Sequence, residues 1–148
     1  MKYEATIMKY FTLLLGLLIA CLCFEVFAAS FDIIVVEASK EGSGFSPALA
    51  PYKNQLSNMG YNSGNVISNR GFNLGIGKSG NFNVAGDISA QITLTKIDDG
   101  FIHFEFKMFQ GDNMIVKMGY RIPDGKHTII SGPSSKNNKY IVIIRASE

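Results

Sequence analysis

The feature that most constrains this chain is a pair of alternating segments on either side of a short acidic turn. The first segment covers residues 89–97, the second covers residues 101–109, and Asp98-Asp99-Gly100 separates them. A three-residue hairpin loop, with Gly100 in the left-handed conformation, joins two such segments as antiparallel strands. The predicted pairs are apolar on one face and mainly polar on the other: Leu94–Phe104, Ile92–Phe106 and Ala90–Met108, against Thr95–His103, Thr93–Glu105 and Gln91–Lys107.

The turn and the alternation select the same register. A slip of one residue would exchange the two faces of one strand and mix apolar with polar positions. One apolar and one polar face are typical of an antiparallel hairpin that covers a core on one side. We expect residues 114–122 to form the next strand, after a turn around Gln110-Gly111-Asp112. Its predicted pairs with the hairpin are Glu105–Lys117, Phe106–Val116 and Met108–Met114.

Two further runs are almost wholly apolar and rich in β-branched residues. They are Phe31 to Ala38 and Tyr140 to Ala146, and such runs form strands that are covered on both faces. One helix is expected between Ser46 and Met59, with Ser46 at the N-cap. Pro51 lacks a backbone donor, so a main helix that starts at Pro51 is the alternative. The apolar stripe of this helix is Leu49, Tyr52, Leu56 and Met59.

Shorter strands are expected at residues 72–76 and 82–84, around a turn at residues 77–80, and at residues 127–131. Together these elements predict an α+β or mainly β fold. We expect an antiparallel β-sandwich-like domain of about seven or eight strands with one helix packed on the sheet. Residues 30–148 are long enough for one such domain and too short for two.

The N-terminal residues have the pattern of a secretory signal peptide. Basic residues precede an apolar run from Phe11 to Phe24, and small residues follow it. We expect residues 1–29 to be a signal peptide that is cleaved after Ala28 or Ala29, so that the domain is exported to the periplasm or secreted. The run is short for a membrane span, and retention of the leader as an anchor is the alternative.

Leu18-Ile19-Ala20-Cys21 resembles the lipobox of bacterial lipoproteins. This resemblance implies a lipid on Cys21 and attachment of the domain to a membrane. The alternative is that Cys21 and Cys23 are ordinary apolar members of the signal peptide. A domain that begins near Ser30 would have no thiol for a disulfide, a nucleophile or a zinc site.

The charged and polar residues exclude some functions and leave others open. The formal net charge is only +2 and the two signs are interspersed, so no nucleic-acid partner is expected.

His103 and Glu105, two residues apart on one strand face, are candidate metal ligands. The alternative is an ordinary polar face with His103 opposite Thr95. No complete motif for a nucleotide or a catalytic group occurs, and we expect neither a cofactor nor catalysis.

Three apolar residues, Phe101, Phe109 and Ile115, fall on the otherwise polar face of the hairpins. They are expected either to meet a second layer of the same domain or to form a partner surface.

The expected function is an exported, non-catalytic binding or structural module with protein partners in the cell envelope, such as an accessory to a surface or secretion assembly. The alternatives are a metal-dependent hydrolase that uses His103 and Glu105, and a membrane-tethered lipoprotein. Membrane contact is expected only through the leader or a lipid on Cys21.

Residues 124–132 read Asp-Gly-Lys-His-Thr-Ile-Ile-Ser-Gly. This segment is similar to a short hairpin in the β-domain of bacterial secretins. The resemblance covers nine residues and implies a hairpin at this point of the chain. No function is carried over from it.

Overall fold

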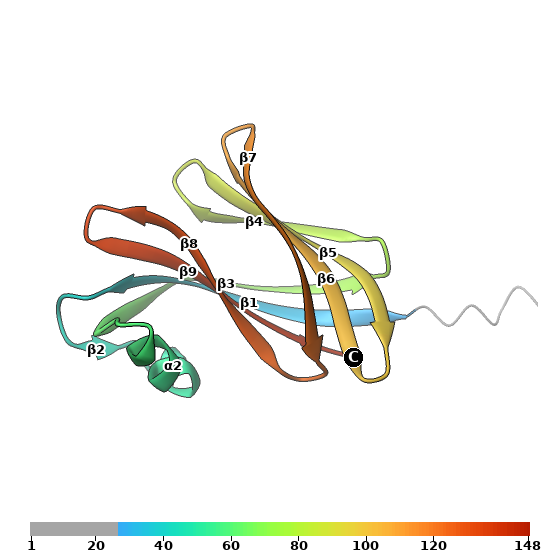
Figure 1. Ribbon diagram of the computed structural model, residues 1–148, viewed down its shortest axis with the longest axis horizontal. Helices are drawn as coiled ribbons and strands as arrows, with labels where there is room; N and C mark the ends of the chain where they lie inside the picture. Colours follow the sequence, from blue (N-terminus) through green and yellow to red (C-terminus); the bar gives the residue numbers. More distant parts are fainter. Residues whose placement is uncertain (1–26) are drawn as a thin grey trace, which may run out of the picture.

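The computed structural model describes residues 27–148, which form two β-sheets and a short helical segment (Figure 1). Sheet A has the order β2 (Gly44–Phe45), β3 (Ser63–Gly75), β1 (Ala28–Ser39), β9 (Asn138–Ser147), β8 (His127–Ser135). Sheet B has the order β4 (Ser79–Ala85), β5 (Ile88–Asp98), β6 (Phe101–Gln110), β7 (Asn113–Pro123). Among the strand pairings of residues 27–148, only the short β2–β3 pairing is parallel. The predicted sandwich-like fold class is confirmed, with nine strands in residues 27–148 instead of seven or eight.

Both faces of sheet A are covered, and its central strands β1 and β9 supply side chains to each. Phe31, Ile33 and Val35 of β1 pack in the main core between the two sheets. Val36 and Ala38 belong to a second cluster on the opposite face. The side chains of β9 alternate in the same way. The two apolar runs are therefore covered on both faces, as the sequence predicts.

The second face of sheet A is covered by two short helical pieces joined end to end. Residues Pro47–Tyr52 form a 3-10 helix, η1, and α2 (Lys53–Asn58) follows directly. Pro51 lies in the first piece and has no N–H to donate, so the α-helix begins only after it. Leu49 and Leu56 are fully buried in the second cluster. Figure 1 shows this segment on the side of sheet A away from sheet B.

The β5–β6 hairpin has the predicted apolar register, but its turn differs from the prediction. Phe104 and Phe106 pair with Leu94 and Ile92 as expected. The turn contains two residues, Asp99 at φ +48° and Gly100 at φ +74°, which is typical of a type I′ turn. Because the turn is one residue shorter than predicted, the strands near it pair one residue out of the predicted register, and Lys96 lies opposite His103 instead of Thr95. A bulge at Thr95 restores the predicted register from Leu94 onward.

The predicted β6–β7 register is wrong by two residues. Lys117 pairs with Lys107, and Met118 pairs with Phe106. The turn contains only Gly111 and Asp112, because Gln110 already pairs with Asn113. The shorter turn accounts for one residue of this shift, and a bulge at Ile115 accounts for the other. Side chains from Val116 onward therefore keep their predicted face, whereas Met114, which lies before the bulge, pairs with Phe109 and changes face. The partners of Met114 and Met118 are therefore not those that the sequence predicts.

Two expected hairpins are crossings between the sheets. The strand predicted at residues 72–76 coincides with the end of β3 except for Ile76, and that at residues 82–84 lies within β4, but β3 belongs to sheet A and β4 to sheet B. Similarly, the turn at residues 124–126 leads from β7 in sheet B to β8 in sheet A. The hairpin implied by the secretin resemblance is therefore absent, because β8 pairs with β9.

Candidate functional site

His103 and Glu105 are neighbours on the outer face of β6, but different partners hold them. The Nε2–H of His103 donates a hydrogen bond to Asp98 Oδ1 over 2.6 Å, and Lys96 forms an ion pair with the same carboxylate. Glu105 lies between two lysines, with Lys107 Nζ at 2.9 Å and Lys117 Nζ at 3.3 Å. Each candidate ligand is thus engaged in a separate ion-pair group.

Within residues 27–148, no group of three or more His, Cys, Asp or Glu side chains is arranged to hold a metal ion. The second histidine, His127, lies elsewhere and binds the helical segment. Its Nε2 is 2.7 Å from Gln55 Oε1, and its ring meets the Tyr52 ring edge to face at 4.9 Å. Among the described residues, His103 and Glu105 are therefore not part of such a group, and Asp98, the carboxylate bound to His103, is also paired with Lys96.

The two ion-pair groups lower the pKa of both carboxyls. The pKa of Asp98 lies below its usual value because of the hydrogen bond from Lys96 and then that from His103. The pKa of Glu105 is lowered mainly by Lys107 and then by Lys117. In both cases the ionised form is the one that the neighbouring cations favour. At neutral pH, Asp98 and Glu105 are therefore ionised and form ion pairs with lysines on the outer face of sheet B.

We expect Glu105→Gln to lower the thermal midpoint at neutral pH but not at acid pH. A carboxyl whose pKa is depressed by folding contributes stability above its unfolded pKa, and this is lost as pH falls through the folded value. The difference in midpoint between the wild type and the variant should be constant above about pH 5 and shrink below about pH 4. Calorimetry across this range measures it. Asp112→Asn, in an exposed turn, is the control, and a pH-independent difference for Glu105→Gln would contradict the assignment.

The apolar candidates on the outer face are divided between two ends of the sheet. Phe101 begins β6 and is covered by Arg121, whose guanidinium carbon is 3.6 Å from the ring centroid. Phe109 lies eight residues further along β6, which corresponds to about 27 Å of strand. A bulge places Met114 opposite Phe109, with Ile115 beside it. Phe109 and Ile115 are therefore brought together, and Phe101 is separate.

A larger exposed apolar surface lies on β7. Met118 is 51% exposed, although it shares a face with the core residues of sheet B. Tyr120 next to it is half-buried, stacks on Phe104 at 5.3 Å and donates a hydrogen bond to the Met118 sulfur at 3.5 Å. Burial raises the pKa of the Tyr120 phenol. We call the apolar side chains of this strand the β7 surface: Met114, Ile115, Val116, Met118 and Tyr120.

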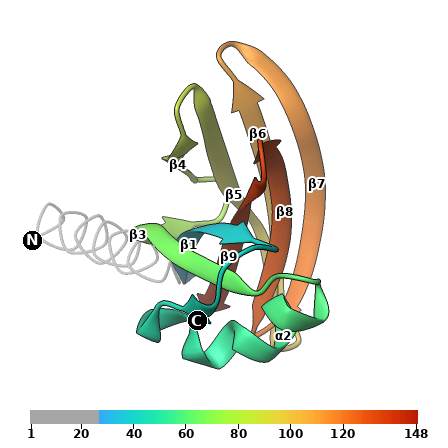
Figure 2. The ribbon, with the colours of Figure 1, turned by 90° about the vertical axis from the view of Figure 1, so that its left-hand side faces the viewer.

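The exposed side chains of the β7 surface are not predicted from the sequence, because their exposure depends on the register of the β6–β7 hairpin. The register predicted there sets Met114 opposite the buried Met108, whereas the observed register places Met114 at the outer end of the hairpin. Figures 1 and 2 show the tip of the β6–β7 hairpin projecting beyond the sandwich, on the side away from α2. Three apolar side chains remain exposed there, namely Met114 at 53%, Ile115 at 44% and Met118 at 51%.

The predictions for the leader are only partly within the described residues. Cys21 lies outside them. Ala28 and Ala29 begin β1, opposite Gly75 and Leu74, and Ala29 is buried in the main core. Cleavage after Ala29 would leave a strand that starts at Ser30. Among residues 27–148, no helix has the length and apolar character needed to cross a membrane.

The comparisons with known proteins add no family to this description. No protein-family model matches the chain, and no curated protein matches it either. The class that the structure defines is a β-sandwich-like α+β fold, with two sheets and a helical segment on the outer face of sheet A. Its function has to be argued from the surfaces described above.

Proposed function

We propose that the domain is an exported, non-catalytic binding module that holds a protein partner of the cell envelope on the β7 surface. The observation that carries this proposal is a set of three exposed apolar side chains, Met114, Ile115 and Met118, on a long edge strand. Large apolar side chains that are exposed together on one element indicate an interaction site. The leader supports export, and the structure supplies the candidate contact.

The edge of β7 is the longest open edge of the two sheets. It contains 11 residues, whereas β4 at the other edge of sheet B contains 7. In sheet A, β2 contains 2 residues, and β8 contains 9 with a bulge at Gly132 and Pro133. The bulge of β7, at Ile115, lies near its hairpin turn and leaves residues 116–123 in one continuous register. An open edge presents unpaired backbone N–H and C=O groups, to which an extended segment of another protein can add as a further strand. Such a strand would cover the exposed side of Met118.

The charges beside β7 indicate the chemistry of that added strand. Lys117 and Arg121 are exposed on the outer face of β7, and Lys107 lies beside them on β6. Within residues 27–148, Glu105 is the one carboxylate that forms ion pairs with Lys107 and Lys117. A strand with acidic residues on its outer face and apolar residues on its inner face would complement both sides of β7. We therefore favour an extended, acidic and amphipathic segment of the partner.

A photo-crosslinking experiment in the native host tests this proposal. A benzophenone amino acid is placed at Met118, or at Met59 as a matched control that is 41% exposed beside the helical segment. We expect one protein to be captured from position 118 and not from position 59. A second probe at position 114 should capture the same protein. In that chain, the substitution Met118→Glu should reduce the amount of crosslinked product by about tenfold or more, because binding of the partner would bury an unpaired charge.

Three results would count against the proposed function. Equal capture from positions 118 and 59, or no capture from either, would leave the β7 surface without a partner. Capture that Met118→Glu does not reduce would place the contact elsewhere. Sedimentation of the purified domain gives an independent reading. A dimer that Met118→Glu dissociates would mean that the partner is a second copy and not an envelope protein.

The proposal on location is tested separately. The intact mass of the protein from membrane and soluble fractions distinguishes a chain that starts at Ala29 or Ser30 from one that starts at an acylated Cys21. A soluble product is expected for a secreted module, and an acylated product would identify a lipoprotein. Either result is compatible with a partner on β7.

A further inference from the structure

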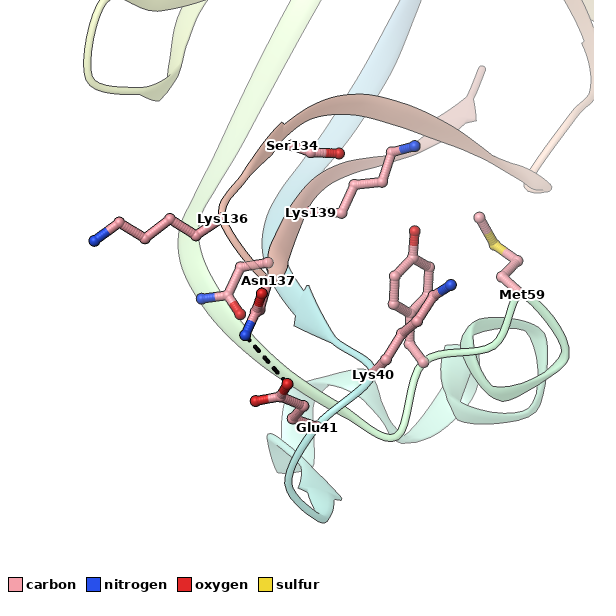
Figure 3. Close-up of a pocket in the computed structure, with 9 residues that line it drawn as sticks. Lys40, Glu41, Met59, Ser134, Lys136, Asn137 and Lys139 are labelled. Atoms are coloured by element: carbon pink, nitrogen blue, oxygen red, sulfur yellow. Dashed lines mark hydrogen bonds between the residues drawn. The ribbon is translucent and has the colours of Figure 1, made fainter.

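A hollow of about 420 Å³ lies at the end of sheet A, between the helical segment and the β8–β9 hairpin. It shares no residue with the β7 surface. Three of its lining residues are lysines, Lys40, Lys136 and Lys139, and its one acidic lining residue is Glu41. In Figure 3 the ammonium groups of Lys40 and Lys139 reach over the hollow, while Lys136 points away from it. A hollow of this volume is in the range of small-molecule sites.

The pairing of β1 with β9 explains why two of these lysines meet. Lys139 lies opposite Ala38, and Lys40 follows Ala38 by two residues. Lys40 directly follows the end of β1 at Ser39, so the two lysines extend from neighbouring segments at the same end of sheet A and both line the hollow. Two flexible ammonium groups that line one hollow can approach opposite sides of one oxyanion and donate charge-assisted hydrogen bonds to it.

The local carboxylates are held by neutral amides and not by these lysines. Asn137 Nδ2 donates to Glu41 Oε1 over 3.1 Å (Figure 3). In the same way, Asn138 Nδ2 donates to Glu37 Oε1 over 2.8 Å. Within residues 27–148, none of the three lysines of the hollow forms an ion pair. The hollow thus combines three positive charges with one negative charge, and that negative charge is already engaged.

The apolar part of the lining limits what else the ligand contains. Tyr61 is 7% exposed at the hollow, and Met59 is 41% exposed beside it. A second hollow, lined by Gln55, His127 and other residues, also includes Met59, so the two hollows adjoin at this residue, just after α2. A fully inorganic anion would leave the thioether uncovered, whereas an anion with an apolar arm would cover it.

We propose that this hollow binds a small organic anion, with a phosphate or sulfate group between Lys40 and Lys139 and an apolar or aromatic arm on Met59. The two ammonium groups hold the oxyanion, and the amides of Asn137 and Asn138 keep the neighbouring carboxylates from competing for them. The arrangement supplies binding and orientation. No bond to the ligand is made or broken.

Titration of the full domain with phenyl phosphate, followed by amide resonances of residues 134–139, tests the proposal. We expect saturable shifts with a Kd of about 1 mM or tighter, and weaker binding of inorganic phosphate, which lacks the arm. Lys40→Gln and Lys139→Gln should each weaken binding about tenfold, since each removes one charge-assisted hydrogen bond. Phenyl sulfate in a parallel titration distinguishes the two oxyanions.

Two control variants separate direct contact from general electrostatics. Lys136→Gln removes a charge from the same hollow but from a side chain that points away, and it should change the Kd by less than about twofold because that charge is screened. Lys53→Gln on α2, outside the hollow, should have no effect. Non-saturable shifts, or equal losses in Lys40→Gln and Lys53→Gln, would overturn the proposal. Thermal midpoints close to that of the wild type confirm that the variants are folded.

Discussion

Replacing Phe104 by alanine is expected to lower the free energy of unfolding by about 3–5 kcal/mol. Phe104 is 1% exposed in the main core. Its ring meets Phe31 of β1 edge to face at 5.5 Å and stacks on Tyr120 of β7 at 5.3 Å. It therefore joins sheet A to sheet B and also supports the inner side of the β7 surface. Urea unfolding followed by circular dichroism measures the change.

The matched control for this variant is Phe101→Ala, three residues earlier on the same strand. Phe101 lies on the outer face, half-buried beneath the Arg121 guanidinium. Its truncation removes partly exposed area and one cation–π contact, so a loss of about 1 kcal/mol or less is expected. Equal losses at Phe101 and Phe104 would show that the two sheets do not share the core described here.

Leu56→Ala is expected to lower the free energy of unfolding by about 2–5 kcal/mol. Leu56 is fully buried in the cluster between α2 and the outer face of sheet A. The segment contains only two short helical pieces, which are too short to be stable alone, so it depends on its buried leucines. Proteolysis within residues 47–59 should accelerate in the variant, because loss of this packing favours local opening of the segment.

Met59→Ala is the control in the same segment. Its side chain is 41% exposed, and its truncation should cost less than about 1 kcal/mol. If Leu56→Ala unfolds at the same urea concentration as Met59→Ala, the second cluster does not stabilise the domain. Unchanged proteolysis in Leu56→Ala would likewise contradict the packing of this segment on sheet A.

Local alternation was sufficient to predict the β5–β6 pairing but not the β6–β7 pairing. In the first hairpin, apolar and polar sets of side chains discriminate between registers that differ by one residue. In the second, registers that differ by two residues keep the same faces, so the pattern cannot separate them. The two-residue turn at Gly111 and Asp112 and the bulge at Ile115, each of which shifts the register by one residue, together decide between them. This difference leaves Met118 exposed at the edge of the core.

The candidate sites depended even more on long-range pairing. The sequence correctly places His103 and Glu105 on one face, but the lysines that pair with Glu105 come from β6 itself and from β7. Lys40 and Lys139 are far apart in the chain and line one hollow because β1 pairs with β9. No local pattern around either lysine indicates the other. Apolar periodicity reports which face a residue occupies, and carries no information about which strand lies beside it.

The sequence by itself determined the class of fold, the two strands that are covered on both faces, and the apolar face of the β5–β6 hairpin. Each of these follows from side-chain alternation and β-branched composition, which act over a few neighbouring residues. Only the tertiary structure decided which strands form each sheet, where β7 lies open, and which charges meet at the end of sheet A. These outcomes depend on turn lengths and on pairing between strands that are distant in the sequence. Such pairings are stabilised jointly, because apolar side chains from strands of both sheets are buried in the same core.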